Sequence, residues 1–378
     1  MRCGMSEPIR VLEVVAAMNL AGTETMLMNF YRNMDRKRVQ FDFAVCTEER
    51  CDYEDEIISM GGQIIRYPQY RGINHFSYIR WWNNFFRDNP NYRIVHGHIG
   101  STAAIYLSIA KKHGCYTIAH SHGSLGPINL RSIIWRMYSY PTRFVADYYF
   151  GCSMDALETR YGNRIAHNKK TSKVLNNAID ASKYIYNINV REEVRKELSI
   201  SPDEWIIGTV GRLSAPKNPQ MTLSIIEDLK NRGEKFRFLW VGEGELRKMI
   251  EDELTKRNLT ENVILLGLRN DVPRLLQAMD IFVFPSISEG LGIAAVESQA
   301  AGLLTLCSNR IPSEAKVTNM CQFISVDDVS KWVTAIVNNK YYNRTNALDS
   351  IIEKGYDIHT VAEWLQEYYL NKWRNKQR

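Results

Sequence analysis

The chain has 378 residues, which is too long for one ordinary hydrophobic core and indicates two domains. Hydrophobic residues make up 45% of it and charged residues 24%, fractions typical of a globular protein and not of a disordered or fibrous chain. Residues 1–182 carry 22 basic and 16 acidic side chains, whereas residues 183–378 carry 26 of each. The whole excess of +6 therefore lies in the first half and indicates an anionic partner there.

No RNP, helix-turn-helix or zinc-finger signature occurs in the sequence, so we do not expect the anionic partner to be nucleic acid. An anionic membrane surface or a lipid-phosphate acceptor fits the charge equally well. The seven cysteines form no CxxC pair and no metal-ligand spacing, which is typical of reduced cytosolic thiols. The segment "IRVLEVVAAM" (9–18) contains Glu13 and predicts a buried strand, not a signal peptide.

Strand-like and helix-like segments alternate along both halves, for example with helical patterns at Glu24–Asn33 and Phe76–Asp88. This alternation predicts an α/β protein with parallel sheets that helices cover on both faces. The expected strands are Arg10–Val15, Phe41–Cys46, Gln63–Tyr67, Ile94–Gly97, Tyr116–His120, Tyr148–Cys152, Trp205–Val210, Arg237–Val241, Val263–Leu266, Ile281–Phe284 and Leu304–Ser308.

The segment "NNAIDASKYIYNINV" (176–190) breaks the periodicity and predicts a linker. We therefore expect two doubly wound, Rossmann-like domains, at residues 1–182 and 183–359. Such sheets bind ligands at the carboxyl ends of their strands, so the two domains are expected to place those ends across a shared cleft.

The segment "TVGRLSAPKNPQMTLSII" (209–226) reads as a strand, a glycine turn and a helix. Arg212 and Lys217 lie in the turn, where a guanidinium fork and an ammonium group can hold a diphosphate. The alternative is a solvated loop with ordinary surface cations, which are common.

The segment "PSISEGLGIAAVESQAAG" (285–302) places Gly290 and Gly292 before a helix that we expect to begin near Ile293. A helix N-terminus of this kind binds anions, yet Glu289 and Glu297 lie on either side of it. The two could be an ordinary turn residue and an exposed helix glutamate. Their small, apolar surroundings favour a different interpretation, since carboxylates accept hydrogen bonds from the hydroxyls of a nucleotide sugar.

The pair Glu289 and Glu297, with seven residues between them, resembles the EX7E motif of the family 4 retaining glycosyltransferases. The segment "AGTETMLMNF" (21–30) is similar to that family's GGxE loop, with Ala21 replacing the first glycine, and "VLNNAID" (174–180) to its VIPNGID linker, with Ala178 replacing glycine. Further similar segments, in order, are "RIVHGHIG" (93–100), "IAHSHG" (118–123), "VGEGELR" (241–247) and "VILLGLRNDVPRLLQAMDIFVFPSISEG" (263–290). The segments "SNRIPSEAKVT" and "GYDIHTVAEWLQEYY" resemble the subgroup that builds exopolysaccharide, capsule or O-antigen chains.

The resemblance implies a GT-B fold whose C-terminal helix, at about 360–378, packs back on the N-terminal domain. It implies transfer of a hexosyl-type sugar from a nucleotide-diphosphate sugar, expected to be a UDP-sugar, with retention of anomeric configuration. The implied acceptor is a glycan, expected to be linked to a lipid diphosphate, in bacterial surface polysaccharide synthesis.

The resemblance also implies roles for single residues. Arg212 and Lys217 would neutralise the departing diphosphate, Glu297 would hold the ribose hydroxyls, and Glu289 would contact the donor sugar. The backbone at Gly290, Leu291, Gly292 and Ile293 would complete the phosphate site. The loop at Gly22 and Thr23 would close over the diphosphate. The nucleoside would lie beside Gly242, Gly244 and Arg269.

One histidine of that family lies near the donor sugar, and "HSH" offers both His120 and His122. Alignment by the strand favours His122, but His120 stays open, while His96 and His98 are expected to be structural. The sequence contains no Asp-x-Asp triplet, the usual carboxylate pair for a metal-bound nucleotide diphosphate. We therefore expect no divalent metal and no cofactor, because cations and the helix dipole compensate the charge.

Two aromatic and basic segments bear on the acceptor side. In residues 70–93, the spacing of Phe76, Ile79, Trp82 and Phe86 predicts the buried stripe of a helix on the sheet. Residues 131–144 are the better candidate for a membrane-facing patch. The protein is accordingly expected in the cytoplasm, as a peripheral protein on the inner face of the cell membrane.

Two other classes of function share this architecture. A sugar-nucleotide epimerase would need acid and base groups at the sugar and would release free nucleotide without an acceptor. A non-catalytic binding subunit would tolerate loss of the motif, yet Arg212, Lys217, Glu289 and Glu297 are all present. Both alternatives are therefore less favoured than a glycosyltransferase.

Overall fold

The computed structural model describes residues 7–123, 137–201 and 203–375. The chain divides into two compact units: unit 1 comprises residues 1–178 and 358–378, and unit 2 comprises residues 179–357. The expected domain ends at 182 and 359 lie four and two residues beyond these boundaries. The predicted linker at 176–190 crosses the first boundary and already contains a 3-10 turn, η2 (Ala181–Tyr184), and the start of a helix at Ile188.

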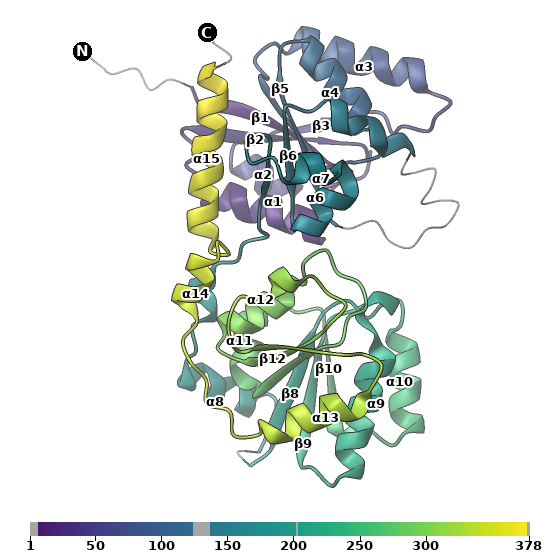
Figure 1. The fold of residues 1–378 in the computed structure, drawn as a ribbon, viewed down its shortest axis with the longest axis vertical. Helices are drawn as coiled ribbons and strands as arrows, with labels where there is room; N and C mark the ends of the chain where they lie inside the picture. Colours follow the sequence, from purple (N-terminus) through teal and green to yellow (C-terminus); the bar gives the residue numbers. More distant parts are fainter. Residues whose placement is uncertain (1–6, 124–136, 202, 376–378) are drawn as a thin grey trace, which may run out of the picture. The chain divides into compact units, whose positions relative to one another are not determined.

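Unit 1 contains a seven-stranded parallel sheet in the order β3-β2-β1-β4-β5-β6-β7 (Figure 1). Six of the strands were predicted to within two residues. The seventh, β7, was missed, since Val174 is the one apolar residue among its three. The strands are β1 (Ile9–Val14), β2 (Val39–Val45), β3 (Ile64–Arg66), β4 (Ile94–Gly97), β5 (Tyr116–Ser121), β6 (Tyr148–Gly151) and β7 (Ser172–Val174).

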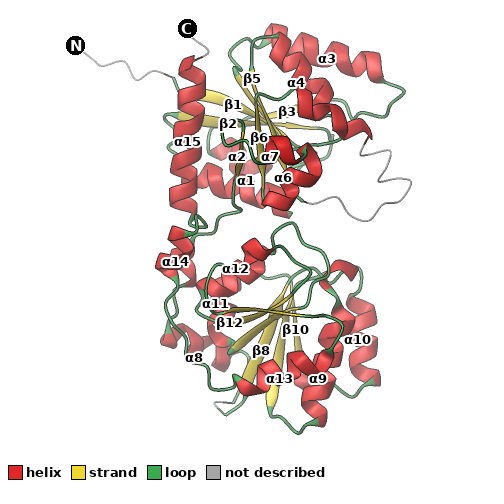
Figure 2. Ribbon diagram, in the orientation of Figure 1, coloured by secondary structure: helices red, strands yellow, loops and turns green. Residues whose placement is uncertain are grey.

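Helices cover both faces of this sheet, as Figure 2 shows. One face packs on α1 (Gly22–Asn33), α2 (Glu54–Ser59) and α15 (Ile358–Asn375). The other face packs on α3 (His75–Asp88), α4 (Ala103–Lys112), α6 (Met154–Tyr161) and α7 (Asn163–Ala166), with the 3-10 turn η1 (Tyr140–Phe144) beside them.

The helix α15 follows unit 2 in the chain but belongs to unit 1, as the family resemblance implied. Its buried Leu365 and Tyr369 lie in the same hydrophobic cluster as Phe30 of α1 and Phe41 of β2. The ring of Tyr369 meets that of Phe41 edge to face, with centroids 5.9 Å apart. The sheet of unit 1 therefore needs a segment from the far end of the chain to complete its core.

The predicted buried stripe of α3 is partly wrong. Trp82 and Phe86 are buried, and Ile79 is partly buried, but Phe76 is 82% exposed. Phe76 is the second residue of the helix, ahead of the turns that meet α4, and Tyr78 takes the buried position instead. The stripe therefore begins two residues later than predicted.

Unit 2 contains a six-stranded parallel sheet in the order β10-β9-β8-β11-β12-β13 (Figure 1). Five strands match the predicted ones closely, and β13 was missed. The strands are β8 (Trp205–Val210), β9 (Phe236–Val241), β10 (Val263–Gly267), β11 (Ile281–Phe284), β12 (Leu304–Ser308) and β13 (Cys321–Ile324).

The helices of unit 2 again cover both faces. One face packs on α8 (Ile188–Glu197), α11 (Val272–Ala278), α12 (Ile293–Ala300) and α14 (Leu348–Glu353). The other packs on α9 (Pro219–Asn231), α10 (Arg247–Lys256) and α13 (Val329–Asn338).

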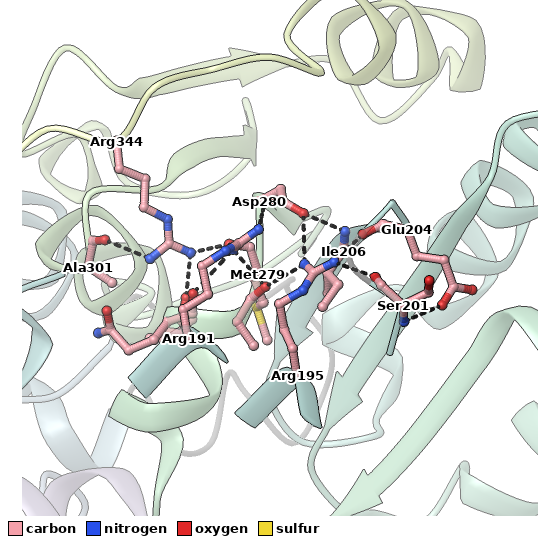
Figure 3. A network of polar contacts seen from close by, with 12 residues as sticks. Arg191, Arg195, Ser201, Glu204, Ile206, Met279, Asp280, Ala301 and Arg344 are labelled. Carbon is pink, nitrogen blue, oxygen red and sulfur yellow. Dashed lines mark hydrogen bonds and ion pairs between the residues drawn. The ribbon is translucent and has the colours of Figure 1, made fainter. Parts of the chain in front are cut away.

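Arginine side chains fix the turn between α11 and β11 (Figure 3). Arg191 donates to the carbonyl oxygen of Met279 at 3.0 Å, and Arg344 donates to the same oxygen. Arg191 also pairs with Asp280 at 2.5 Å, and Asp280 in turn accepts the backbone N–H of Ile206 at 2.6 Å. These bonds satisfy carbonyls at a helix C-terminus and hold β11 in place beside β8.

No helix in the described ranges is long and apolar enough to cross a lipid bilayer. The predicted surface patch at 131–144 begins outside the described residues. Its described part, from residue 137 onward, exposes four large side chains by half or more: Met137, Tyr138, Tyr140 and Phe144.

Candidate active site

Two turns at the carboxyl edge of the unit 2 sheet, after β8 and after β9, are hydrogen-bonded to each other. Gly211 N–H donates to Val241 O at 2.9 Å, and Leu213 N–H donates to Glu243 O at 2.9 Å. The approach leaves no space for side chains, since a Cβ on Gly242 would lie 2.0 Å from Gly211 O. A Cβ on Gly244 would lie 2.3 Å from Leu213 O. Gly242 and Gly244 were expected beside the nucleoside, and the structure gives both of them a packing role in shaping this edge.

A small pocket lies between these turns and the end of β11, lined by Arg212, Ser214, Lys217, Phe284 and Ser286 among others. Arg212 is 72% exposed and makes one ion pair, with Glu245 at 3.3 Å. It is therefore available to a ligand at little cost, because exposed ion pairs contribute little.

Lys217 lies inside the pocket and is more tightly held than Arg212. Its Nζ is 2.5 Å from Glu289 Oε1 and 4.8 Å from the centre of the Phe284 ring. The Glu289 side chain is only 11% exposed. The sequence-predicted cation and the first glutamate of the EX7E pair are thus in direct contact.

A helix starts after the loop that follows Glu289, as the sequence predicted. Helix α12 begins at Ile293, and Gly292 precedes it with φ of 89°, a left-handed conformation that favours glycine. Leu291 is buried, with 3% exposure, and anchors the loop next to Gly290. The N-terminus of α12 therefore follows this loop directly, and the positive end of a helix dipole favours an anion there.

Glu297 lies one turn into α12 and is partly buried. Tyr184 of η2 donates its hydroxyl proton to Glu297 Oε1 at 2.7 Å. Burial raises the pKa of Glu297 to about 7, and the bond from Tyr184 offsets only part of this effect. Sequence reasoning missed Tyr184, and the available signal was an aromatic residue in a polar linker.

Arg269 pairs with two acidic side chains of the protein itself. It donates two hydrogen bonds to Asp271, both at 2.7 Å, and one to Glu197 at 3.4 Å. The bidentate bond to Asp271 raises the pKa of Arg269 and fixes its orientation. A contact with the nucleoside would require Arg269 to share or leave this pairing.

In unit 1, Gly22 and Thr23 open helix α1 directly after the β1–α1 loop. A Cβ on Gly22 would meet no atom within 4 Å among the described residues. Unlike at Gly242, packing among the described residues does not require a glycine at this position. Close approach of a ligand to the backbone therefore remains the expected reason for Gly22.

The carboxyl edge of the unit 1 sheet carries a cluster of four histidines: His96, His98, His120 and His122. His98 Nε2 is 2.7 Å from Glu13 Oε2, and His98 Nδ1 is 2.7 Å from His122 Nε2. The rings of His120 and His122 have centroids 4.1 Å apart. Both candidates for the single site histidine are therefore in one cluster, and His96 and His98 adjoin them.

Comparisons with known proteins agree with this architecture. Residues 190–337 match the domain family described as "Glycosyl transferases group 1". The chain is 29% identical over 362 residues to the "Putative glycosyltransferase EpsF" of Bacillus subtilis (strain 168), covering 92% of this chain and 93% of that protein. It is 24% identical to the capsular polysaccharide biosynthesis glycosyltransferase CapH of Staphylococcus aureus, covering 96% and 99%.

A third relative has a more specific name. The UDP-Gal:alpha-D-GlcNAc-diphosphoundecaprenol alpha-1,3-galactosyltransferase of Escherichia coli is 27% identical, covering 75% of this chain and 77% of that protein. Among solved structures, Anabaena HepE in complex with UDP and glucose superposes with a TM-score of 0.76 at 14% identity, covering 96% and 100%. Sucrose-phosphate synthase from Thermosynechococcus elongatus gives 0.77 at 14% identity, covering 97% and 99%.

The domain match, the relatives and the two parallel sheets lead to one conclusion. The chain is a glycosyltransferase of the GT-B fold, with a group 1 glycosyltransferase domain at residues 190–337, and it is related to enzymes of exopolysaccharide and capsule synthesis.

Proposed function

We propose that the enzyme transfers a hexosyl-type sugar from a UDP-sugar to a lipid-diphosphate-linked glycan, with retention of configuration and without a divalent metal at the diphosphate. The observation that carries this proposal is the contact between Lys217 and Glu289 beside the start of α12. A cation, a carboxylate and a helix N-terminus meet there: the cation and the helix N-terminus suit the diphosphate of a nucleotide sugar, and the carboxylate suits its hydroxyl groups.

The charges dictate how a donor would occupy the site. The diphosphate takes Lys217 away from Glu289 and accepts N–H bonds from the first turn of α12. Arg212 lies on the same turn as Lys217, and its exposed guanidinium group adds two hydrogen bonds to the diphosphate from the solvent side. Glu289 is then left to accept hydroxyl protons of the sugar, and Glu297 those of the ribose.

In the transfer step, the bond between the anomeric carbon and the diphosphate oxygen breaks, and the acceptor hydroxyl oxygen bonds to the same face. The acceptor proton passes to the departing diphosphate. The negative charge that develops on the diphosphate is stabilised by Lys217, Arg212 and the helix N-terminus, which replace a metal ion in this role.

The names of two similar proteins support the choice of substrates. The E. coli relative is named for UDP-Gal and a diphosphoundecaprenol-linked sugar, and HepE was crystallised with UDP and glucose. For the membrane, the support is the exposed Met137, Tyr138, Tyr140 and Phe144 together with the +6 charge of residues 1–182. We propose peripheral contact with an anionic membrane through this face.

The proposal is tested by thermal shift with UDP-, GDP- and ADP-sugars, followed by product analysis on an undecaprenyl-diphosphate glycan. We expect UDP-sugars to raise the melting temperature, and NMR of the product to show the anomeric configuration of the donor. The rate should not depend on added Mg²⁺ or Mn²⁺. A product with inverted configuration would overturn the proposed retention. A strict requirement for Mg²⁺ or Mn²⁺ would overturn the proposed metal independence.

A further inference from the structure

The histidine cluster (His96, His98, His120, His122) contains buried nitrogen atoms that have no hydrogen-bond partner among the described residues. They are His96 Nε2, both ring nitrogens of His120, and His122 Nδ1. His120 is 3% exposed and the side chain of His98 1%. Buried polar atoms are nearly always paired, so four unpaired nitrogens at one place need an explanation.

The strand register brings these side chains together. In the parallel pair of β4 and β5, Gly97 lies opposite Ala119, which places His98 beside His120. The pattern H-x-H occurs on both strands, and side chains two residues apart point to the same face of a sheet. Ligand nitrogens of His96, His98 and His120 all lie within 4.8 Å of one another.

Glu13 fixes which nitrogen of each ring carries the proton. Glu13 is a carboxylate 2.7 Å from His98 Nε2, and a carboxylate only accepts hydrogen bonds. His98 must donate from Nε2, which leaves Nδ1 as a lone pair. Tyr369 donates to Glu13 Oε1 at 3.3 Å, so it accepts from His96 Nδ1 at 2.7 Å. His96 Nε2 is then also a lone pair.

The same reasoning extends to the other two rings. His122 Nε2 donates to His98 Nδ1, and His122 Nδ1 therefore carries a lone pair. In either tautomer of a neutral imidazole, one of the two nitrogens of His120 carries a lone pair. The lone pairs of His96 Nε2, His122 Nδ1 and one nitrogen of His120 therefore have no hydrogen-bond donor among the described residues.

We propose that the histidine cluster binds a divalent transition metal of the Zn²⁺ type, with His96, His98 and His120 as ligands and His122 as the adjacent fourth nitrogen donor. Imidazole nitrogens suit Zn²⁺, Co²⁺ and Ni²⁺, whereas Mg²⁺ and Ca²⁺ require oxygen ligands. Three histidines with one further position is a common zinc arrangement. Glu13 and Tyr369 would orient the ligands, since metal-binding histidines usually donate their other N–H to a carboxylate or similar acceptor.

This site goes beyond the proposed function. It lies in unit 1, whereas the proposed diphosphate site lies in unit 2, and its nitrogen donors would not hold the Mg²⁺ or Mn²⁺ that serves other transferases at a diphosphate. Metal binding can be measured without donor, acceptor or turnover. Failure of this proposal and failure of the proposed function are therefore distinguishable.

The test uses the full chain, prepared without a polyhistidine tag and stripped of metal by dialysis against a chelator. One equivalent of Co²⁺ should produce the intense visible absorption of tetrahedral coordination, and Zn²⁺ should displace it and raise the melting temperature. His98→Gln and His120→Gln should abolish the band. Glu13→Gln should weaken Zn²⁺ binding by about 10- to 100-fold, as loss of an orienting partner does.

His167→Gln is the matched control, because His167 is 60% exposed and pairs with a glutamate outside the cluster. It should bind Co²⁺ as the unaltered protein does. The proposal is wrong if the unaltered protein gives no tetrahedral Co²⁺ band, a result that does not depend on the folding of any variant. It is also wrong if His120→Gln, folded, binds Zn²⁺ as tightly as His167→Gln.

Discussion

Lys217 and Glu289 lie 72 residues apart in the chain and form an ion pair of 2.5 Å across the pocket at the carboxyl edge of the unit 2 sheet. Each satisfies the other, so neither charge is left buried and unpaired. A diphosphate would compete with Glu289 for Lys217. The pair therefore predicts that the two residues have different, separable effects on binding and turnover.

Lys217→Ala should weaken UDP binding by about 10- to 100-fold, because a hydrogen bond to a charged group contributes about 1.5–3 kcal/mol. Titration calorimetry with UDP measures the change. Lys248→Ala is the matched control, since Lys248 on α10 is 88% exposed and its ion pair is solvated. Equal affinities of the two variants would remove Lys217 from the diphosphate site.

Glu289→Gln should lower turnover by about 100-fold through loss of sugar positioning, while UDP binding stays equal or becomes tighter. The reason is that the substitution releases Lys217 from its competitor. Steady-state kinetics and UDP calorimetry on the same preparation measure both effects. Glu251→Gln, on exposed α10, is the control. A large loss of UDP affinity in Glu289→Gln would contradict the division of roles.

Glu297→Gln should stabilise the ligand-free protein at pH 8 by about 2 kcal/mol and abolish the stabilisation by UDP-sugar. The pKa of Glu297 in the folded protein is about 7, above its unfolded value, so the folded state binds the extra proton between these values. Stability of the unaltered protein should fall as the pH rises through 7, and the advantage of the variant should vanish near pH 4.5. Denaturant unfolding of both proteins between pH 4.5 and pH 8 measures whether stability falls or rises with pH.

Gly242→Ala should lower the free energy of unfolding by about 1–3 kcal/mol and reduce donor binding, because the new Cβ would push Gly211 O away from the pocket. Gly233→Ala is the control: its φ of 75° imposes the same kind of backbone strain, but its Cβ would meet nothing within 4 Å. Similar losses in both variants would mean that backbone strain, and not the clash, is responsible.

Gly22→Ala should leave the melting temperature unchanged or slightly higher, since alanine favours a helix more than glycine and its Cβ meets no atom. The Michaelis constant for the donor should nevertheless rise, because the backbone could no longer approach the diphosphate closely. Unchanged kinetics would exclude the loop at Gly22 and Thr23 from the donor site.

The sequence predicted the elements that carry the most regular patterns. Eleven strands were placed to within two residues, whereas β7 and β13 were missed. The start of α12 at Ile293 could be predicted because two glycines precede it, and Gly292 has the positive φ that only glycine adopts readily.

What the sequence could not supply was contact between residues far apart in the chain. The pairing of Tyr184 with Glu297 depends on where η2 packs, and the histidine cluster depends on β4 and β5 being neighbours. The sequence did not show that His96 and His98 lie beside His120 and His122. Alternation within one strand does not reveal which strand is its neighbour in the sheet. The repeated H-x-H pattern at two strand ends was the one available signal.

Helix α15 has a consequence for biosynthesis. Tyr369 completes the hydrophobic core around Phe41 and reaches Glu13, yet it is translated only after all of residues 179–357. Unit 2 is continuous in sequence and can form as soon as it leaves the ribosome, whereas the sheet of unit 1 must wait for its last helix. The order of folding would then be the reverse of the order of synthesis, and the first half would remain exposed to chaperones and proteases until α15 arrives.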